Sequence, residues 1–177
     1  MGDYELSQWD HNLDDPLSPF RISFHTPGLL RAGALEAYAR IVELHGRDSD
    51  KAQQAIHKAF DDGPEFLIAS ALEAAARLPN VSIPVPTEAV LAHPEADVRV
   101  AGLKRWAAIN EGVPSSDLGD ALRRDPAPAV RHLLLGLARD RKAWEIVSAF
   151  TEDPDAIIRE IARDGLSRQE APPNPRT

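Results

Sequence analysis

The sequence predicts an all-α protein, in which helix pairs stack one on another as a short solenoid. Hydrophobic residues make up 43% of the 177 residues but aromatic residues only 6%, so the core must consist mainly of Ala, Leu, Ile and Val, which suits packed helices better than a β-sandwich. Apolar residues recur at spacings of three and four, the period of a helix with one buried face. Prolines recur at steps of 30, 32 and 28 residues, an interval typical of helical repeat arrays; they are Pro64, Pro94, Pro126 and Pro154.

The first 26 residues differ from the rest of the chain. Pro16 and Pro19 interrupt any helix there, yet the segment holds more large apolar side chains than a disordered arm would carry: Tyr4, Leu6, Trp9, Leu13, Leu17, Phe20, Ile22 and Phe24. We therefore expect residues 1–26 to form an irregular arm packed on the first helices. Residues 27–167 are expected to form the solenoid, and the proline-rich tail, 168–177, to be disordered.

Helical spacing and boundary residues predict each helix in turn. In the first half, helices are expected over 27–45, over 49–60 and from the turn at 61–64 to about 78, followed by a proline-rich connection at 79–86. In the second half, short and long helices are expected to alternate, over 87–92, 95–109, 116–124, 127–139, 142–150 and 154–167.

The recurring prolines have similar surroundings. Four residues after three of them comes a β-branched residue and then an arginine, whereas Pro64 is followed more loosely by Ile68 and Ala69. Proline suits the first turn of a helix, where its missing N–H would have no partner. An aspartate just before the proline can accept hydrogen bonds from free backbone N–H groups, and the β-branched residue is expected to face the neighbouring helix. The pairs are Val98-Arg99, Val130-Arg131 and Ile158-Arg159.

The segments from Asp125 to Arg131 and from Asp153 to Arg159 both read Asp-Pro, three residues, a β-branched residue, then Arg. This signature resembles HEAT-type repeats and the leucine-rich-repeat variant, over about residues 64–167. The resemblance implies a short right-handed α-α superhelix of about four to five helix pairs. It also implies a structural ladder between repeats without any chemistry, made by Asp125, Asp153, Arg99, Arg131 and Arg159. His93 stands where the first repeat would carry its aspartate.

Charge and composition exclude several classes of function. The net charge is −8, with 14 acidic and 7 basic residues in 1–92 against 14 and 13 in 93–177. This balance argues against general binding of nucleic-acid phosphates and fits a basic protein partner, or serves only solubility. Without cysteine, thiol catalysis, zinc-thiolate sites and disulfides are excluded. No secretory signal and no long apolar run is found, so we expect a cytoplasmic protein that does not enter a membrane.

The sequence predicts no catalytic residue, cofactor or metal site. Six histidines are present, but none has the spacing of a metal motif. The residues chosen as a partner-binding site are two tryptophans and the arginines beside them, because tryptophan and arginine are common in binding hot spots; the alternative is that the tryptophans only fill the core. They are Trp106, Arg105, Trp144, Arg139 and Arg141.

Two functions of different classes follow. The first is a non-catalytic protein–protein interaction module, with a bacterial immunity or antitoxin-type protein that binds a basic partner as its most specific form. The alternative is a HEAT-like nucleic-acid-binding protein or DNA glycosylase-like enzyme, which would use Trp106, Trp144 and the arginines of the C-terminal half. A third, a chromophore-handling protein like the HEAT-like bilin lyases, has no pocket-specific signal.

Overall fold

The structure is a computed structural model that describes residues 27–46 and 49–170. The predicted arm over 1–26 and residues 171–177 of the predicted tail lie outside these residues. The described residues form helices and no strands, which confirms the all-α prediction. The elements are α2 (Pro27–His45), α3 (Ser49–Asp62), α4 (Glu65–Arg77), α5 (Thr87–Leu91), α6 (Ala96–Ile109), α7 (Ser116–Arg123), α8 (Pro128–Asp140), α9 (Trp144–Ala149), the 3₁₀ turn η1 (Phe150–Glu152) and α10 (Ala156–Glu170).

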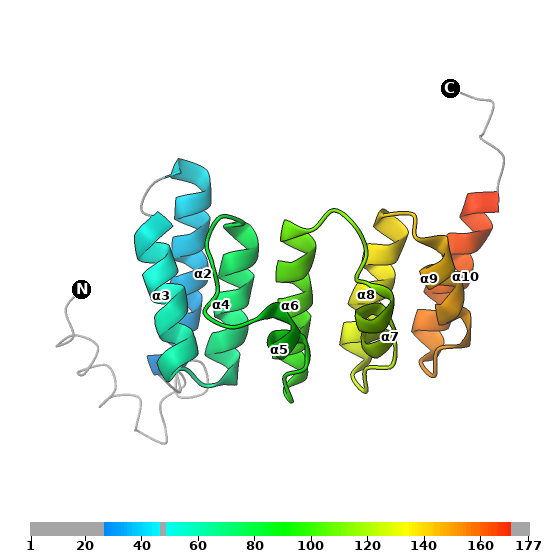
Figure 1. Ribbon diagram of the computed structural model, residues 1–177, viewed down its shortest axis with the longest axis horizontal. Coiled ribbons are helices and arrows are strands. Elements are labelled where there is room, and N and C mark those ends of the chain that lie inside the picture. Colours follow the sequence, from blue (N-terminus) through cyan, green and yellow to red (C-terminus); the bar gives the residue numbers. More distant parts are fainter. Residues whose placement is uncertain (1–26, 47–48, 171–177) are drawn as a thin grey trace, which may run out of the picture.

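The helices α2, α4, α6, α8 and α10 stand side by side, and we call them the long-helix row (Figure 1). Each contacts the next, while α3 packs on α2 and α4, α5 on α6, α7 on α8 and α9 on both α8 and α10. The core runs along the row in three clusters of buried side chains. The β-branched residues of the sequence repeat lie inside these clusters, because Val98, Val130 and Ile158 are all buried.

The recurring prolines do not occupy the first helical turn, so that prediction is wrong for three of them. The helices α6, α8 and α10 begin two residues after Pro94, Pro126 and Pro154. The residues before α6 and α8, Glu95 and Ala127, have an extended backbone. The carbonyl of each of the three prolines accepts a hydrogen bond from an arginine side chain, as described below. The proline therefore belongs to a turn that precedes the helix. Pro128, a second proline, does occupy the start of α8.

The boundary between α8 and α9 also differs from the prediction. A helix was expected from residue 142, but α9 begins at Trp144. Lys142 has a positive φ of 56°, and its N–H donates to Arg139 O while that of Ala143 donates to Ala138 O. This pair of bonds is the Schellman cap that closes a helix in the left-handed conformation. Lys142 thus ends α8. At the other end of the chain α10 continues to Glu170, three residues past the predicted limit.

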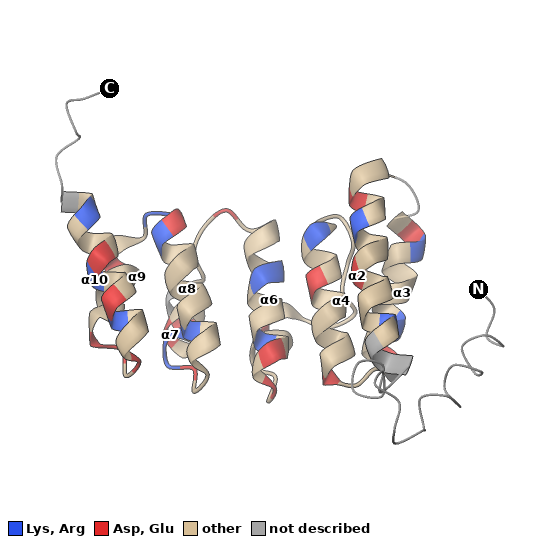
Figure 2. Ribbon diagram, turned by 180° about the vertical axis from the view of Figure 1, so that it is seen from behind, with Lys and Arg blue, Asp and Glu red and all other residues tan. Residues whose placement is uncertain are grey.

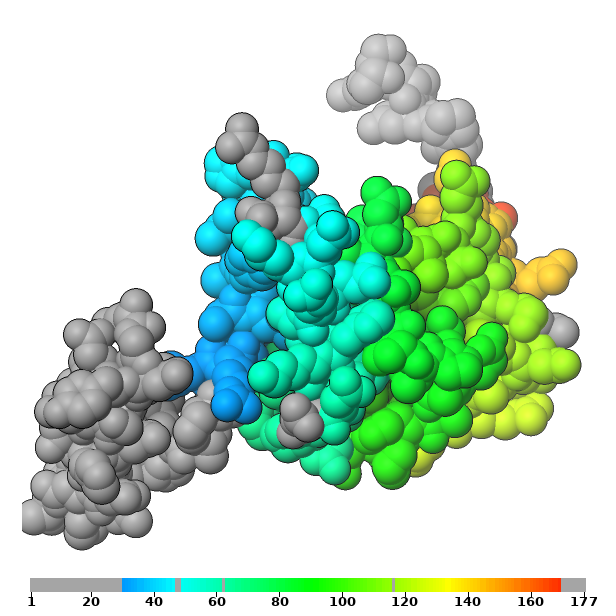
Figure 3. All heavy atoms as spheres, turned by 60° about the vertical axis from the view of Figure 1, so that its left-hand side comes forward, coloured from blue at the N-terminus to red at the C-terminus, as the bar shows by residue number. Residues whose placement is uncertain are grey.

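The first end of the row is only partly covered by the described residues (Figure 3, α2 in blue and α3 in cyan). Leu30 and Ile41 on α2 are 41% and 53% exposed, because among the described helices α2 packs mainly on α3 and α4. A groove of about 360 Å³ opens between α2, α3 and α4, lined in part by Leu35, Tyr38 and Ala59.

Candidate functional site

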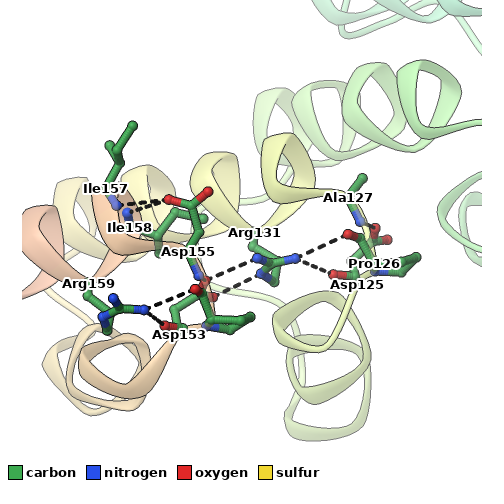
Figure 4. Close-up of polar contacts among 10 residues, drawn as sticks. Asp125, Pro126, Ala127, Arg131, Asp153, Asp155, Ile157, Ile158 and Arg159 are labelled. Atoms are coloured by element: carbon green, nitrogen blue, oxygen red, sulfur yellow. Dashed lines mark hydrogen bonds and ion pairs between the residues drawn. The ribbon is translucent and has the colours of Figure 1, made fainter.

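Two buried arginine–aspartate pairs link successive helices of the long-helix row. Arg99 on α6 donates from Nε to Asp125 Oδ2 at 2.7 Å and from Nη2 to Oδ1 at 2.8 Å. Arg131 on α8 binds Asp153 in the same way, at 2.9 Å and 3.0 Å (Figure 4). All four residues are between 5% and 8% exposed. Two parallel bonds to one carboxylate give a fixed orientation as well as attraction, so each pair sets the position of one helix against the next.

Each arginine also binds the turn that precedes its own helix. The remaining nitrogen, Nη1, donates to the carbonyl of the residue before the proline and then to that of the proline itself. These bonds fix the turn against the helix that follows it, since both carbonyls accept from the same nitrogen. The distances are 2.7 and 2.7 Å for Arg99, 2.7 and 3.3 Å for Arg131, and 2.6 and 3.0 Å for Arg159.

The aspartates have a second role in the same turns. Oδ1 of Asp125 accepts from Ala127 N, and Oδ1 of Asp153 from Asp155 N, both at 2.8 Å. In the first repeat, His93 Nδ1 accepts from the corresponding N–H, that of Glu95, at 3.1 Å. His93 therefore replaces the turn-forming acceptor without supplying a charge.

The arginine that would pair with position 93 is absent as well. By its spacing from Pro64 it would lie at residue 69, which is alanine. Both members of the first rung are missing together, so neither leaves a buried charge without its partner.

The buried pairs shift the ionisation of their acids. Burial alone would raise the pKa of the Asp125 carboxyl, but the hydrogen bond from Arg99, the bond from Ala127 N and the charges of Arg99 and Arg131 outweigh it and hold this pKa below its ordinary value of 3.8. For Asp153 burial again acts upward, and the contacts with Arg131 and the backbone hold its pKa below 3.8 in the same manner. Both carboxylates are therefore charged in the folded protein at neutral pH.

These shifts predict that the protein loses stability in acid. Because the pKa of each aspartate is lower in the folded chain, the unfolded chain binds more protons as the pH falls through 3.8. The stabilisation is fully present above about pH 5 and is lost progressively below it. In urea unfolding measured across this pH range, the free energy of unfolding should fall less steeply with decreasing pH for Asp153→Asn than for the wild type. Asp120→Asn, an exposed carboxylate, is the control, and equal slopes in Asp153→Asn and the wild type would contradict the prediction.

A different arginine links α4 to α6 where the first rung is missing. Arg105 donates from Nη1 to Ala75 O at 2.6 Å and from Nη2 to Val81 O at 2.6 Å, with longer bonds to Leu78 O and Pro79 O. The residue is 5% exposed, and burial lowers the pKa of its guanidinium. The prediction that Arg105 lies on a partner-binding surface is therefore wrong, because its terminal nitrogens are all directed at the backbone of this chain.

The other predicted site residues fall into two separate settings. Arg141 lies over the indole of Trp106, 5.5 Å from the ring centroid, and donates from Nη2 to Ala107 O at 2.7 Å. Trp106 is half-buried and packs on the core cluster of the C-terminal half. This contact connects the end of α8 to α6, so both side chains have partners within the protein.

Trp144 and Arg139 lie in the second setting, a hollow of about 430 Å³ between α8 and α10 that we call the tryptophan hollow. Two glycines within helices, Gly136 and Gly165, open it, and Arg168 stands beside it with Asp140 and Gln169. Arg139 and Asp164 approach within 3.9 Å across the two helices. The two glycines and Arg168 were not among the predicted site residues. Other glycines also lie inside the predicted helices, so the sequence does not single out Gly136 and Gly165.

Other site types and similarities can be stated briefly. Over residues 27–46 and 49–170, no group of His, Asp and Glu side chains could hold a metal ion. No helix in the described part of the chain is long and apolar enough to cross a membrane. No protein-family model matches the sequence, and no curated protein is significantly similar to it.

Proposed function

We propose that the protein is a non-catalytic protein-interaction module, built as a short right-handed solenoid of the HEAT-like kind. The support is a unit that recurs three times, in which a short helix, a turn with proline and a long helix follow each other. In each unit a buried β-branched residue and the same two arginine-to-carbonyl bonds recur. Solenoids of this kind use an extended surface to bind other proteins.

The tryptophan hollow is the observation that carries this proposal. Glycine within a helix costs about 1 kcal/mol relative to alanine, and Gly136 has no packing reason to be small, since a Cβ there would meet nothing within 4 Å. Trp144 is half-buried and packs in part on the core cluster of the C-terminal half, and it lines the hollow together with the two glycines, Arg139 and Arg168. Tryptophan and arginine beside a hollow are the usual components of a binding hot spot, so we assign the hollow to a side chain of a partner protein.

The charges around the long-helix row are consistent with a protein partner. Basic and acidic residues are interspersed along the ribbons of these helices (Figure 2). Much of the acidic excess of the first half lies in residues 1–26, which hold five acidic residues and one basic residue. The immunity-type form of the proposal, with a basic partner, therefore depends on this segment. Deleting residues 2–26 should abolish a salt-sensitive interaction of that kind.

Variants of Gly136 test the hollow. Gly136→Ala should raise the free energy of unfolding by about 0.5–1 kcal/mol, and Gly136→Gln, whose longer side chain can enter the hollow, should weaken partner binding by about tenfold or more. The partner is first captured with the tagged full chain, identified by mass spectrometry and purified, and its Kd is then measured by calorimetry. Ala129→Gln, an exposed position on the same helix, is the matched control. Equal affinity of Gly136→Gln and the wild type would overturn the assignment.

Nucleic-acid binding is the second candidate, favoured by the same tryptophan and arginines, on which a base could stack. Arg139 and Arg168 are both accompanied by Asp164, which reduces the attraction for phosphate. At low ionic strength we expect no gel shift with single- or double-stranded DNA. Salt-sensitive binding that is lost in Trp144→Ala would replace the protein-binding proposal with this one.

A further inference from the structure

We propose that the outer face of α10 is a second binding surface, at which Arg159 binds the carboxylate of an aspartate-bearing turn from a partner protein. This surface is distinct from the tryptophan hollow, and the inference does not depend on what the hollow binds. It is based on the way this chain already uses the equivalent arginines.

The two earlier arginines show what this position binds. Arg99 and Arg131 each use one nitrogen, Nη1, for their own turn, and the Nε and Nη2 edge for the aspartate of the next turn along the chain. Arg159 makes the first set of bonds in the same way, to Asp153 O at 2.6 Å and Pro154 O at 3.0 Å. Figure 4 shows these two bonds of Arg159. Within residues 27–46 and 49–170, Arg159 makes no ion pair with a carboxylate through its other edge.

The free edge of Arg159 is already oriented for a ligand. Its two bonds to backbone carbonyls hold the guanidinium as they do in Arg131, so little side-chain freedom would be lost on binding. A hollow of about 550 Å³ lies beside it on the face of α10, lined by Ala156, Arg159, Glu160, Arg163, Asp164 and Ser167. A carboxylate from another molecule can therefore approach from outside the row.

The rest of this face favours a polar ligand over another packed helix. The position four residues after the arginine is leucine in α6 and α8, and both Leu103 and Leu135 are fully buried. In α10 the same position is Arg163, an exposed cation one turn from Arg159. Asp164 on this face is already paired with Arg168, at 3.0 Å. Where α6 and α8 each make an apolar contact with the next helix, α10 thus carries a second cation, Arg163. Two neighbouring cations suit a partner turn that carries two carboxylates.

The chain itself supplies a suitable probe. The octapeptide with the sequence of residues 150–157 contains the Asp-Pro turn that Arg131 binds within the protein, with further carboxylates on either side. We expect this peptide to shift the Nε–H resonance of Arg159 in the NMR spectrum of the full-length protein, with saturation at millimolar concentration. Replacing the aspartate before its proline by asparagine should remove the shift. No shift at about 10 mM peptide, a concentration that detects any Kd stronger than that value, would overturn the proposal.

Arg159→Lys is the decisive variant, because it keeps the charge but cannot form two parallel bonds to one carboxylate. Because Arg159→Lys has no guanidinium Nε–H at this position, its affinity and that of the other variants are measured from the backbone amide resonances of α10. We expect Arg159→Lys to weaken binding of the peptide by about fivefold or more, Arg163→Gln to weaken it less, and Gly136→Gln to leave it unchanged. Melting curves establish that each variant is folded. Equal binding to Arg159→Lys and to the wild type would refute a carboxylate held side-on. Stronger saturation of the Arg159 Nε–H resonance by inorganic phosphate than by the peptide would show a general anion site and would likewise overturn the proposal.

Discussion

Arg131→Ala is expected to lower the free energy of unfolding by about 2–4 kcal/mol. The substitution leaves Asp153, whose side chain is 2% exposed, as a buried carboxylate without its cation. It also removes the donor to the carbonyls of Asp125 and Pro126 in the turn before α8. The link between α8 and the turn before α10, which the pair with Asp153 makes, is lost as well. The loss can be measured by urea unfolding at neutral pH.

Two other arginines provide the comparison. Arg124 is paired with Asp120 at 3.6 Å, but its side chain is 71% exposed, so Arg124→Ala should cost no more than about 1 kcal/mol. Arg159 binds its turn in the same way as Arg131, but among the described residues it has no buried carboxylate to leave unpaired. Arg159→Ala should therefore lower the free energy of unfolding by more than Arg124→Ala and by less than Arg131→Ala. A loss for Arg131→Ala no larger than that for Arg124→Ala would show that the buried pair does not stabilise the fold.

Arg105→Ala is also expected to lower the free energy of unfolding by about 2–4 kcal/mol, but for a different reason. Four backbone carbonyls at the end of α4 and in the segment after it, those of residues 75, 78, 79 and 81, would lose their donor. A positive charge at the C-terminal end of a helix also favours the helix dipole. The variant should lose both contributions and leave a cavity between α4 and α6.

The neighbouring residue is a matched control for this prediction. Lys104 also connects α6 to α4, through an ion pair with Glu73, but its side chain is 44% exposed. Lys104→Ala should therefore change the free energy of unfolding by less than about 1 kcal/mol. If the two substitutions have equal effects in urea, the buried carbonyl contacts of Arg105 do not hold α4 against α6.

Arg131 and Arg105 also show how far the site could be predicted from the sequence. The three-and-four spacing of apolar residues located every helix, because that period is local to the chain. The recurring prolines identified the arginines and aspartates that the structure places together, Arg99 with Asp125 and Arg131 with Asp153. Arg105 was assigned to a partner-binding surface because it stands beside Trp106, and nothing in its local pattern predicts its burial. Lys104 is exposed and Arg105 is buried because of the side of α6 that packs against α4.

The sequence by itself determined that the chain is helical, where its helices lie within a few residues, and which charged residues recur with the repeat. Helix formation and turn chemistry depend on neighbours in the chain, so they can be read from spacing. The tertiary structure alone decided that Gly136 and Gly165 line one hollow beside Trp144 and that Arg105 is enclosed by carbonyls. It also decided that Arg159 has one edge without a carboxylate partner among the residues that the structure describes. Each of these facts depends on which helices become neighbours, and contacts between residues far apart in the chain leave no local pattern in the sequence.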